Sequence, residues 1–129
     1  MTTLAQRVRY AMETVDLHEM EAMLAPNARW GAPEQEVPTC RNATEILAWY
    51  ELARANGVRA DITEVSVMGQ HLLVGLKIIA TRDGPPKSKN RTRWQVLSVR
   101  DGQITEIRGY EKRREAVEFV TTGVSHWTS

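Results

Sequence analysis

The sequence feature that most constrains the fold is a β-hairpin signal in the last third of the chain. Residues 91–110 form two segments that alternate apolar and polar side chains around Arg100-Asp101-Gly102. An Asp-Gly pair between alternating segments is the strongest short-range hairpin signal. We therefore expect two antiparallel strands here. They follow helix, helix, strand, helix, strand and strand, an order that predicts a curled sheet closing over helices around a pocket.

Two loop lengths fit this hairpin. A two-residue loop pairs Leu97 with Glu106, whereas a three-residue loop with a left-handed Gly102 pairs Leu97 with Thr105 and Trp94 with Arg108. We favour the second, because cross-strand opposite charges and a cation–π contact are each worth up to about 1 kcal/mol. One face of the hairpin then carries Arg91, Arg93, Gln95, Leu97, Ile107, Gly109 and Glu111. The other carries Thr92, Trp94, Val96, Ser98, Glu106, Arg108 and Tyr110.

Apolar periodicity and capping residues predict the remaining elements. Helices are expected from Leu4 to Val15, from a cap at Asp16 to Pro26-Asn27, from a cap at Asn42 to Gly57, and over 113–120. Strands are expected over 28–32, 58–68 and 71–81, with loops at 33–39 and 83–90. We expect one domain over residues 1–121 and a tail over 122–129.

Composition excludes several function classes. The chain has 129 residues and a net charge of +1, so it lacks the basic balance of a nucleic-acid-binding protein. No apolar run approaches the length of a membrane span. The single cysteine, Cys40, allows no internal disulfide and suits a reducing compartment, so a cytoplasmic location is expected. The three histidines are far apart, so no metal site is expected. No cofactor motif is present.

The second hairpin face has a composition typical of an interface. It mixes Trp94, Val96, Arg108 and Tyr110, and aromatic residues with arginine are enriched at protein–protein interfaces. If the opposite face lies over the helices, this one needs a cover. A second copy of the chain would supply it, so we expect a homodimer through the outer face of the sheet.

The order of the elements and several short motifs resemble the nuclear transport factor 2-like superfamily, in particular its SnoaL-like (polyketide cyclase-like) branch. The motifs are Asp16-Leu17, Ala28-Arg-Trp30, Cys40-Arg-Asn-Ala-Thr-Glu-Ile46, Val99-Arg-Asp-Gly-Gln-Ile104 and Gly109-Tyr110. The resemblance covers roughly residues 4–120. It implies an α+β fold of the cystatin-like type: a conical barrel in which a curved, mostly antiparallel sheet wraps over three N-terminal helices. It also implies a deep pocket and a homodimer.

The catalytic residues that this resemblance would supply are replaced in the chain. Ala32 stands where ketosteroid isomerases have an aspartate base, and Gln95 stands at their second aspartate. Leu76, Ile78 and Gly109 stand at the epoxide hydrolase positions. Because alanine cannot accept a proton, the usual isomerase mechanism is not available here. The sequence therefore leaves open whether the protein is an enzyme.

The candidate site combines aromatic and polar side chains. The expected ligand-binding residues are Trp30, Trp49, Tyr50, Leu24, Leu76, Ile78, Arg93, Gln95 and Ile107, and the candidate catalytic residues are Glu111 and Gln95. Aromatic and apolar walls with few polar groups are typical of small-molecule pockets. Three functions stay open: a binding domain for a hydrophobic small molecule, an isomerase, cyclase or lyase acting on a polyketide- or terpenoid-like substrate, and a dimeric interaction module.

Overall fold

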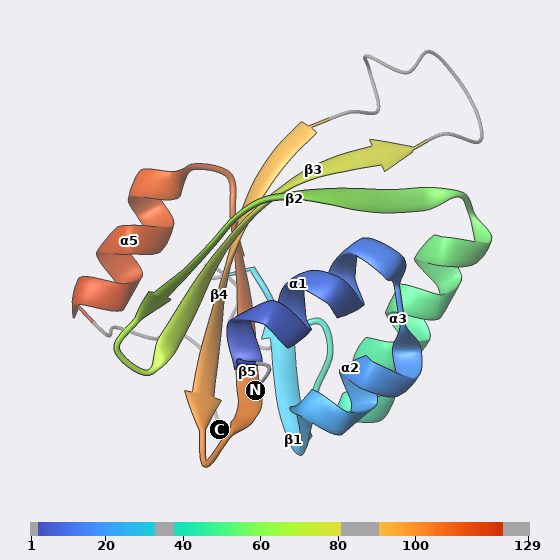
Figure 1. The fold of residues 1–129 in the computed structure, drawn as a ribbon, viewed down its shortest axis with the longest axis horizontal. Coiled ribbons are helices and arrows are strands. Elements are labelled where there is room, and N and C mark those ends of the chain that lie inside the picture. Colours follow the sequence, from blue (N-terminus) through green and yellow to red (C-terminus); the bar gives the residue numbers. More distant parts are fainter. Residues whose placement is uncertain (1–2, 33–37, 81–90, 123–129) are drawn as a thin grey trace.

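The structure is a computed structural model that describes residues 3–32, 38–80 and 91–122 (Figure 1). In chain order the elements are α1 (Leu4–Thr14), α2 (Leu17–Met23), β1 (Leu24–Gly31), α3 (Ala43–Ala55), β2 (Val58–Met68), β3 (His71–Ala80), β4 (Arg91–Arg100), β5 (Gln103–Tyr110) and α5 (Arg113–Thr122). This order confirms the predicted succession of helices and strands. The predicted loop at 83–90 and most of the loop at 33–39 and of the tail lie outside the described residues.

The strands form one mixed sheet in the order β1-β5-β4-β3-β2. β1 runs parallel to β5, and the other neighbours are antiparallel. β1 and β2 lie at opposite edges of this sheet, so among the described strands it stays open. The α+β class and the cystatin-like arrangement are confirmed. The sheet was expected to close into a conical barrel, but it does not. Figure 1 shows α1, α2 and α3 on one face of the sheet and α5 on the other.

The predicted caps fix the starts of the helices. The Asp16 carboxylate accepts a hydrogen bond from the Glu19 amide at 3.1 Å, and the Asn42 side chain accepts one from the Glu45 amide at 2.9 Å. Each bond satisfies a backbone donor that the first turn of a helix leaves unpaired. Gly57 follows α3 with a φ of 77°, the left-handed conformation expected after a helix end.

The second helix is shorter, and the first strand longer, than the sequence predicted. α2 ends at Met23, and β1 begins at Leu24 rather than at Ala28. Pro26 is the physical reason, because proline lacks an amide hydrogen and disfavours helical geometry at the residue before it. A proline is tolerated in an edge strand such as β1.

The predicted register of the last hairpin was wrong. Asp101 and Gly102 both have positive φ, 52° and 76°, and form a two-residue turn. A bulge in β5 then adds a residue, so Leu97 lies opposite Ile107 and Trp94 opposite Tyr110. Neither loop considered from the sequence included this bulge. Beyond the bulge the observed register differs from the predicted one by two residues, which leaves the side chains on their predicted faces. These faces are confirmed for Leu97 and Ile107, which lie in one core cluster, and for Val96 and Tyr110, which lie in another.

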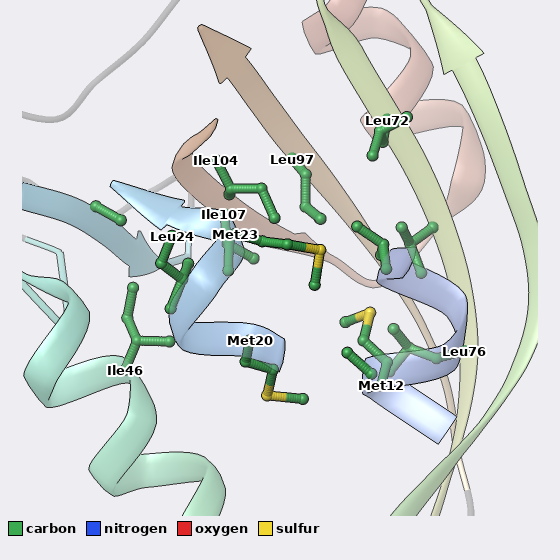
Figure 2. Close-up of a cluster of buried hydrophobic side chains, with 14 of the residues drawn as sticks. Met12, Met20, Met23, Leu24, Ile46, Leu72, Leu76, Leu97, Ile104 and Ile107 are labelled. Atoms are coloured by element: carbon green, nitrogen blue, oxygen red, sulfur yellow. The ribbon is translucent and has the colours of Figure 1, made fainter. Parts of the chain in front are cut away.

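The larger core cluster occupies part of the space between the three N-terminal helices and the sheet. Figure 2 shows side chains from α1, α2 and α3 facing Leu72, Leu76, Leu97, Ile104 and Ile107 from the strands. Met12 on α1 and Met20 and Met23 on α2 belong to this cluster, and flexible methionine side chains fill irregular gaps well.

A second core cluster lies under α5 on the opposite face of the sheet. Val96, Tyr110 and Ala116 are buried there, and the Arg108 guanidinium lies 4.7 Å from the centre of the Phe119 ring. Arg108 is only 1% exposed and donates a 2.6 Å hydrogen bond to Glu106. A buried arginine is stable only where its charge is paired. Glu106 also accepts a hydrogen bond from Arg29 on β1.

This arrangement corrects the reason given for a homodimer. Val96, Arg108 and Tyr110 are buried within a single chain, because α5 supplies the cover that a second copy was expected to supply. Trp94 is partly buried and lies 5.8 Å from the Arg113 guanidinium. The homodimer itself stays a prediction, and its interface would have to use other side chains of this face.

Candidate functional site

A cavity of about 530 Å³ lies between the helices and the sheet, and we call it the aromatic cavity. It is bounded by α1, α3 and strands β1–β4. Its lining residues are Met12, Val15, Trp30, Trp49, Tyr50, Leu52, Ala53, Asn56, Val58, Arg59, Ala60, Leu76, Ile78 and Gln95. Small-molecule sites are mostly of 300–1,000 Å³ and are lined by apolar and aromatic side chains with few polar groups. The size and chemistry of the cavity fit that range.

Three aromatic rings form one wall of the aromatic cavity. Trp30 projects from β1, and Trp49 and Tyr50 follow each other on α3. The Trp30 and Tyr50 rings are stacked with centroids 5.6 Å apart, while Trp49 meets Trp30 edge-on at 4.3 Å. Such pairs contribute about 0.5–1.5 kcal/mol beyond the area that they bury. The three rings therefore stabilise one another and present a fixed apolar wall.

Gln95 is the buried polar group of the cavity. It lies on β4 and is 7% exposed, and its Oε1 atom forms no hydrogen bond within the part of the chain that the structure describes. Its side chain is hydrogen-bonded to Tyr50. Burial raises the pKa of Tyr50 to about 12, and the bond to Gln95 opposes part of that rise. At neutral pH the phenol is therefore uncharged, and an unused amide oxygen borders the cavity.

A second cavity of about 230 Å³ adjoins the first, and we call it the small chamber. Trp30, Trp49, Ile78 and Gln95 line both spaces, so they form the boundary between them. The other lining residues of the small chamber are Gly31, Ala32, Thr39, Arg93, Trp94 and Gly109. Arg93 lies two residues before Gln95 on the same face of β4 and supplies a positive charge.

The structure brings together most of the residues that the sequence selected. Trp30, Trp49, Tyr50, Leu76, Ile78 and Gln95 line the aromatic cavity, and Arg93 lines the small chamber. Leu24 and Ile107 do not reach either space. They are buried in the main core, where they border a hollow of only about 20 Å³.

The candidate base Glu111 lies elsewhere. It follows the end of β5, is exposed, and is absent from the lining of both cavities. A catalytic base has to lie within hydrogen-bond reach of the proton that it takes. Its exposed position outside both cavities gives no geometric support for the expected catalytic role.

Several lining residues were not selected from the sequence. Met12 and Val15 on α1 and Ala53 and Asn56 at the end of α3 close one side of the aromatic cavity, and Arg59 lies on β2. Periodicity predicts the apolar face of a helix but not whether that face borders a cavity or a filled core.

The two cavities contain cations but no carboxylates among the described lining residues. Arg59 lines the larger space and Arg93 the smaller one. Within residues 3–32, 38–80 and 91–122, no group of three histidine, cysteine or acidic side chains could hold a metal ion. The arrangement can bury an apolar body, accept a hydrogen bond at Gln95 and offer a positive charge.

Solved structures with low sequence identity share the fold. A cystatin-fold protein from Novosphingobium aromaticivorans superimposes with a TM-score of 0.72 at 12% identity, covering 84% of this chain and 97% of that one. An NTF2-like protein of unknown function from Cytophaga hutchinsonii gives 0.65 at 13% identity, covering 91% and 96%. A putative polyketide cyclase from Sinorhizobium meliloti gives 0.63 at 20% identity, covering 83% and 93%. The protein therefore has a nuclear transport factor 2-like, cystatin-like fold.

The family follows from the sequence itself. Residues 5–107 match the model of the SnoaL-like domain, which is most of the chain. The chain belongs to the SnoaL-like domain family, as its motifs predicted. No curated protein matches it. Among the described residues, no helix is long and apolar enough to cross a membrane.

Proposed function

We propose that this SnoaL-like domain binds a small, largely apolar molecule in the aromatic cavity and accepts one hydrogen bond from it at Gln95. The observation that carries the proposal is a buried amide oxygen that has no partner among the described residues, at the boundary of a cavity walled by three aromatic rings. An unpartnered buried acceptor costs about 1–3 kcal/mol, and a ligand donor would remove that cost.

The aromatic wall supports a flat, apolar ligand body. Burying apolar surface contributes roughly 25 cal/mol per Å², and stacking on an aromatic wall adds to it. Leu76 and Ile78 on β3 face the same space from the sheet, so a ring system would contact apolar groups on both sides. The single acceptor on Gln95 would then orient the bound molecule.

Binding is favoured over proton-transfer catalysis by the titratable groups of the cavity. Tyr50, with its pKa raised to about 12, stays protonated at neutral pH. A general base works best with a pKa near the operating pH. The isomerase, cyclase or lyase alternative therefore lacks a base among the described lining residues. The cytoplasmic location stays a prediction based on the single cysteine.

A pair of matched ligands tests the proposal. 2-Naphthol carries a hydroxyl donor, and 2-methoxynaphthalene has nearly the same shape without that donor. We expect 2-naphthol to bind the wild-type protein about tenfold more tightly, measured by isothermal titration calorimetry, because one hydrogen bond is worth about 1.4 kcal/mol. In Gln95→Met, which keeps the side-chain length, the two ligands should bind equally.

A blocking variant controls for binding elsewhere. Ala53→Trp on α3 would fill the aromatic cavity from the side and should weaken both ligands. If both ligands bind Ala53→Trp as tightly as the wild-type protein, they do not occupy this cavity. If neither binds the wild-type protein, the proposed function is wrong for flat apolar molecules of this size.

A further inference from the structure

The small chamber contains a guanidinium, that of Arg93, for which the described residues supply no partner. Arg93 is partly buried, yet within the described part of the chain its side chain forms no hydrogen bond and no ion pair. Two other arginines of the sheet, Arg29 and Arg108, both donate to Glu106. A charge taken partly out of water without a partner is costly. Arg93 therefore has an unused capacity to bind an anion.

The sheet keeps room around this guanidinium. Gly109 lies opposite Gln95 in the β4–β5 ladder, and a Cβ atom added there would stand 3.5 Å from Arg93 Nη2. The side chain of Arg93 thus extends over a position where the neighbouring strand has no side chain. A carboxylate can approach the guanidinium through the space that a larger residue at position 109 would occupy.

The two cavities are placed to hold one molecule. Gln95, Trp30, Trp49 and Ile78 border both, so a ligand body in the aromatic cavity can continue past Gln95 into the small chamber. No carboxylate of the described residues lines either space. The combined site therefore has a partly buried cation, Arg93, in the small chamber and an apolar aromatic wall in the larger space, where the cation Arg59 is exposed to solvent. That combination suits an amphiphilic acid.

We propose that the ligand is an apolar carboxylic acid whose body lies in the aromatic cavity and whose carboxylate binds Arg93 in the small chamber. The inference rests on the proposed function and adds the chemical class of the ligand. Arginine is suited to this role, because its planar guanidinium binds a carboxylate through two parallel hydrogen bonds. The carboxylate supplies the partner that Arg93 lacks, and the chain between acid and ring system passes Gln95.

A fluorescent acid and its uncharged amide test this proposal. 1-Pyrenebutanoic acid and 1-pyrenebutanamide have the same ring system and nearly the same shape and differ in charge. We expect the acid to bind the wild-type protein at least tenfold more tightly, measured by fluorescence titration, because hydrogen bonds between charged groups are roughly twice as strong as neutral ones. In Arg93→Gln the acid should lose this advantage while the affinity for the amide stays unchanged. Arg93→Lys should restore part of it.

Arg100→Gln is the matched control, since it removes an exposed cation of the same strand that lines neither cavity. That variant should keep the preference for the acid. Loss of the preference in Arg59→Gln, which removes the cation of the aromatic cavity, but not in Arg93→Gln would overturn the proposal and place the acid at the other end of the site. Equal binding of acid and amide by the wild-type protein would overturn the carboxylate inference and leave the proposed function standing. If neither probe binds while 2-naphthol does, a ligand of this length does not fit both spaces, and the two-cavity proposal is wrong.

Discussion

The rings of Trp30 and Tyr50 are stacked almost in parallel, with an interplanar angle of 4° and centroids 5.6 Å apart. One ring comes from β1 and the other from α3, so the stack joins the first edge strand to the third helix. Tyr50 in turn is hydrogen-bonded to Gln95 on β4. The stack therefore positions both the apolar wall and the polar group of the aromatic cavity.

Trp49 should matter for binding more than for folding. Its side chain is 41% exposed and meets Trp30 edge-on at the boundary of the two cavities. Trp49→Ala should weaken the binding of 2-naphthol about tenfold, because a ligand would lose an aromatic contact. The free energy of unfolding should fall by about 1 kcal/mol, because the edge-on contacts with Trp30 and Tyr50 are lost as well. Tyr10→Ala, which removes an exposed aromatic ring of α1 outside both cavities, should change neither quantity. An unaltered affinity in Trp49→Ala would show that the ligand does not touch this ring.

Replacing Gly75 by even the smallest larger residue, alanine, should destabilise the fold. Gly75 lies opposite Trp94 in the β3–β4 ladder, and an added Cβ would stand 2.5 Å from the Trp94 ring and 2.8 Å from Thr63 Oγ1. Gly75→Ala should therefore destabilise the fold by about 1–3 kcal/mol, measured by urea unfolding. Gly109→Ala is the matched control, because its Cβ would make only an ordinary contact with Arg93 at 3.5 Å. Equal stability of the two variants would contradict the described packing of Trp94 over β3.

Glu106 should be required for stability, because it faces two arginines. It accepts hydrogen bonds from Arg29 and from the buried Arg108. Glu106→Gln would leave the Arg108 charge in the core without its carboxylate and should cost about 2 kcal/mol in the free energy of unfolding. Glu13→Gln, which removes a partner at 3.9 Å from the exposed Arg9, should cost less than about 0.5 kcal/mol. Similar losses of unfolding free energy in the two variants would mean that Glu106 does not stabilise the buried charge of Arg108.

The lowered pKa of Glu64 predicts that the protein loses stability in acid. Two hydrogen bonds from Arg113, at 3.0 and 2.9 Å, and one from Ser66 lower the pKa of the Glu64 carboxyl group from 4.5 to about 2. A carboxyl group whose pKa is lower in the folded than in the unfolded state stabilises the fold at pH values above its unfolded-state pKa. That contribution should be complete above about pH 4.5 and should be lost as the pH falls toward 2.

Glu64→Gln provides the measurement. The difference in unfolding free energy between the wild-type protein and this variant should be largest above pH 5 and should shrink steadily toward pH 2. Both groups are partly exposed, so high salt should reduce the difference as well. A difference that is independent of pH would show that the Glu64–Arg113 pair is not formed in solution.

Much of the fold could be predicted from the sequence, because local signals agreed with one another. Asp16 and Asn42 marked helix starts, and Asp101-Gly102 marked the hairpin. The hairpin register could not be predicted, because a bulge at Thr105 leaves no clear composition signal while changing every cross-strand pair. The role of α5 was missed for a related reason. A short amphipathic helix after the last strand can pack on either face of a sheet, and only tertiary packing decides which.

The candidate site was predictable in part. Trp30, Trp49 and Tyr50 were identifiable because large aromatic residues on β1 and α3 point to the same side of the sheet in this fold. Leu24 and Ile107 lie in the main core and outside the lining of both cavities, and the sequence could not show this because a core residue and a cavity residue have the same apolar character. Glu111 follows the end of β5 and lies outside both linings, and its catalytic role stays a prediction.

The most direct measurement of the central claim is a titration of the ¹⁵N-labelled protein with 2-naphthol, followed by ¹H–¹⁵N correlation spectra. The account predicts that the largest shifts occur for the indole N–H groups of Trp30 and Trp49 and for the side-chain amide of Gln95, with saturation at a single affinity. Spectra in which these three signals stay unchanged while signals elsewhere on the protein move would contradict it.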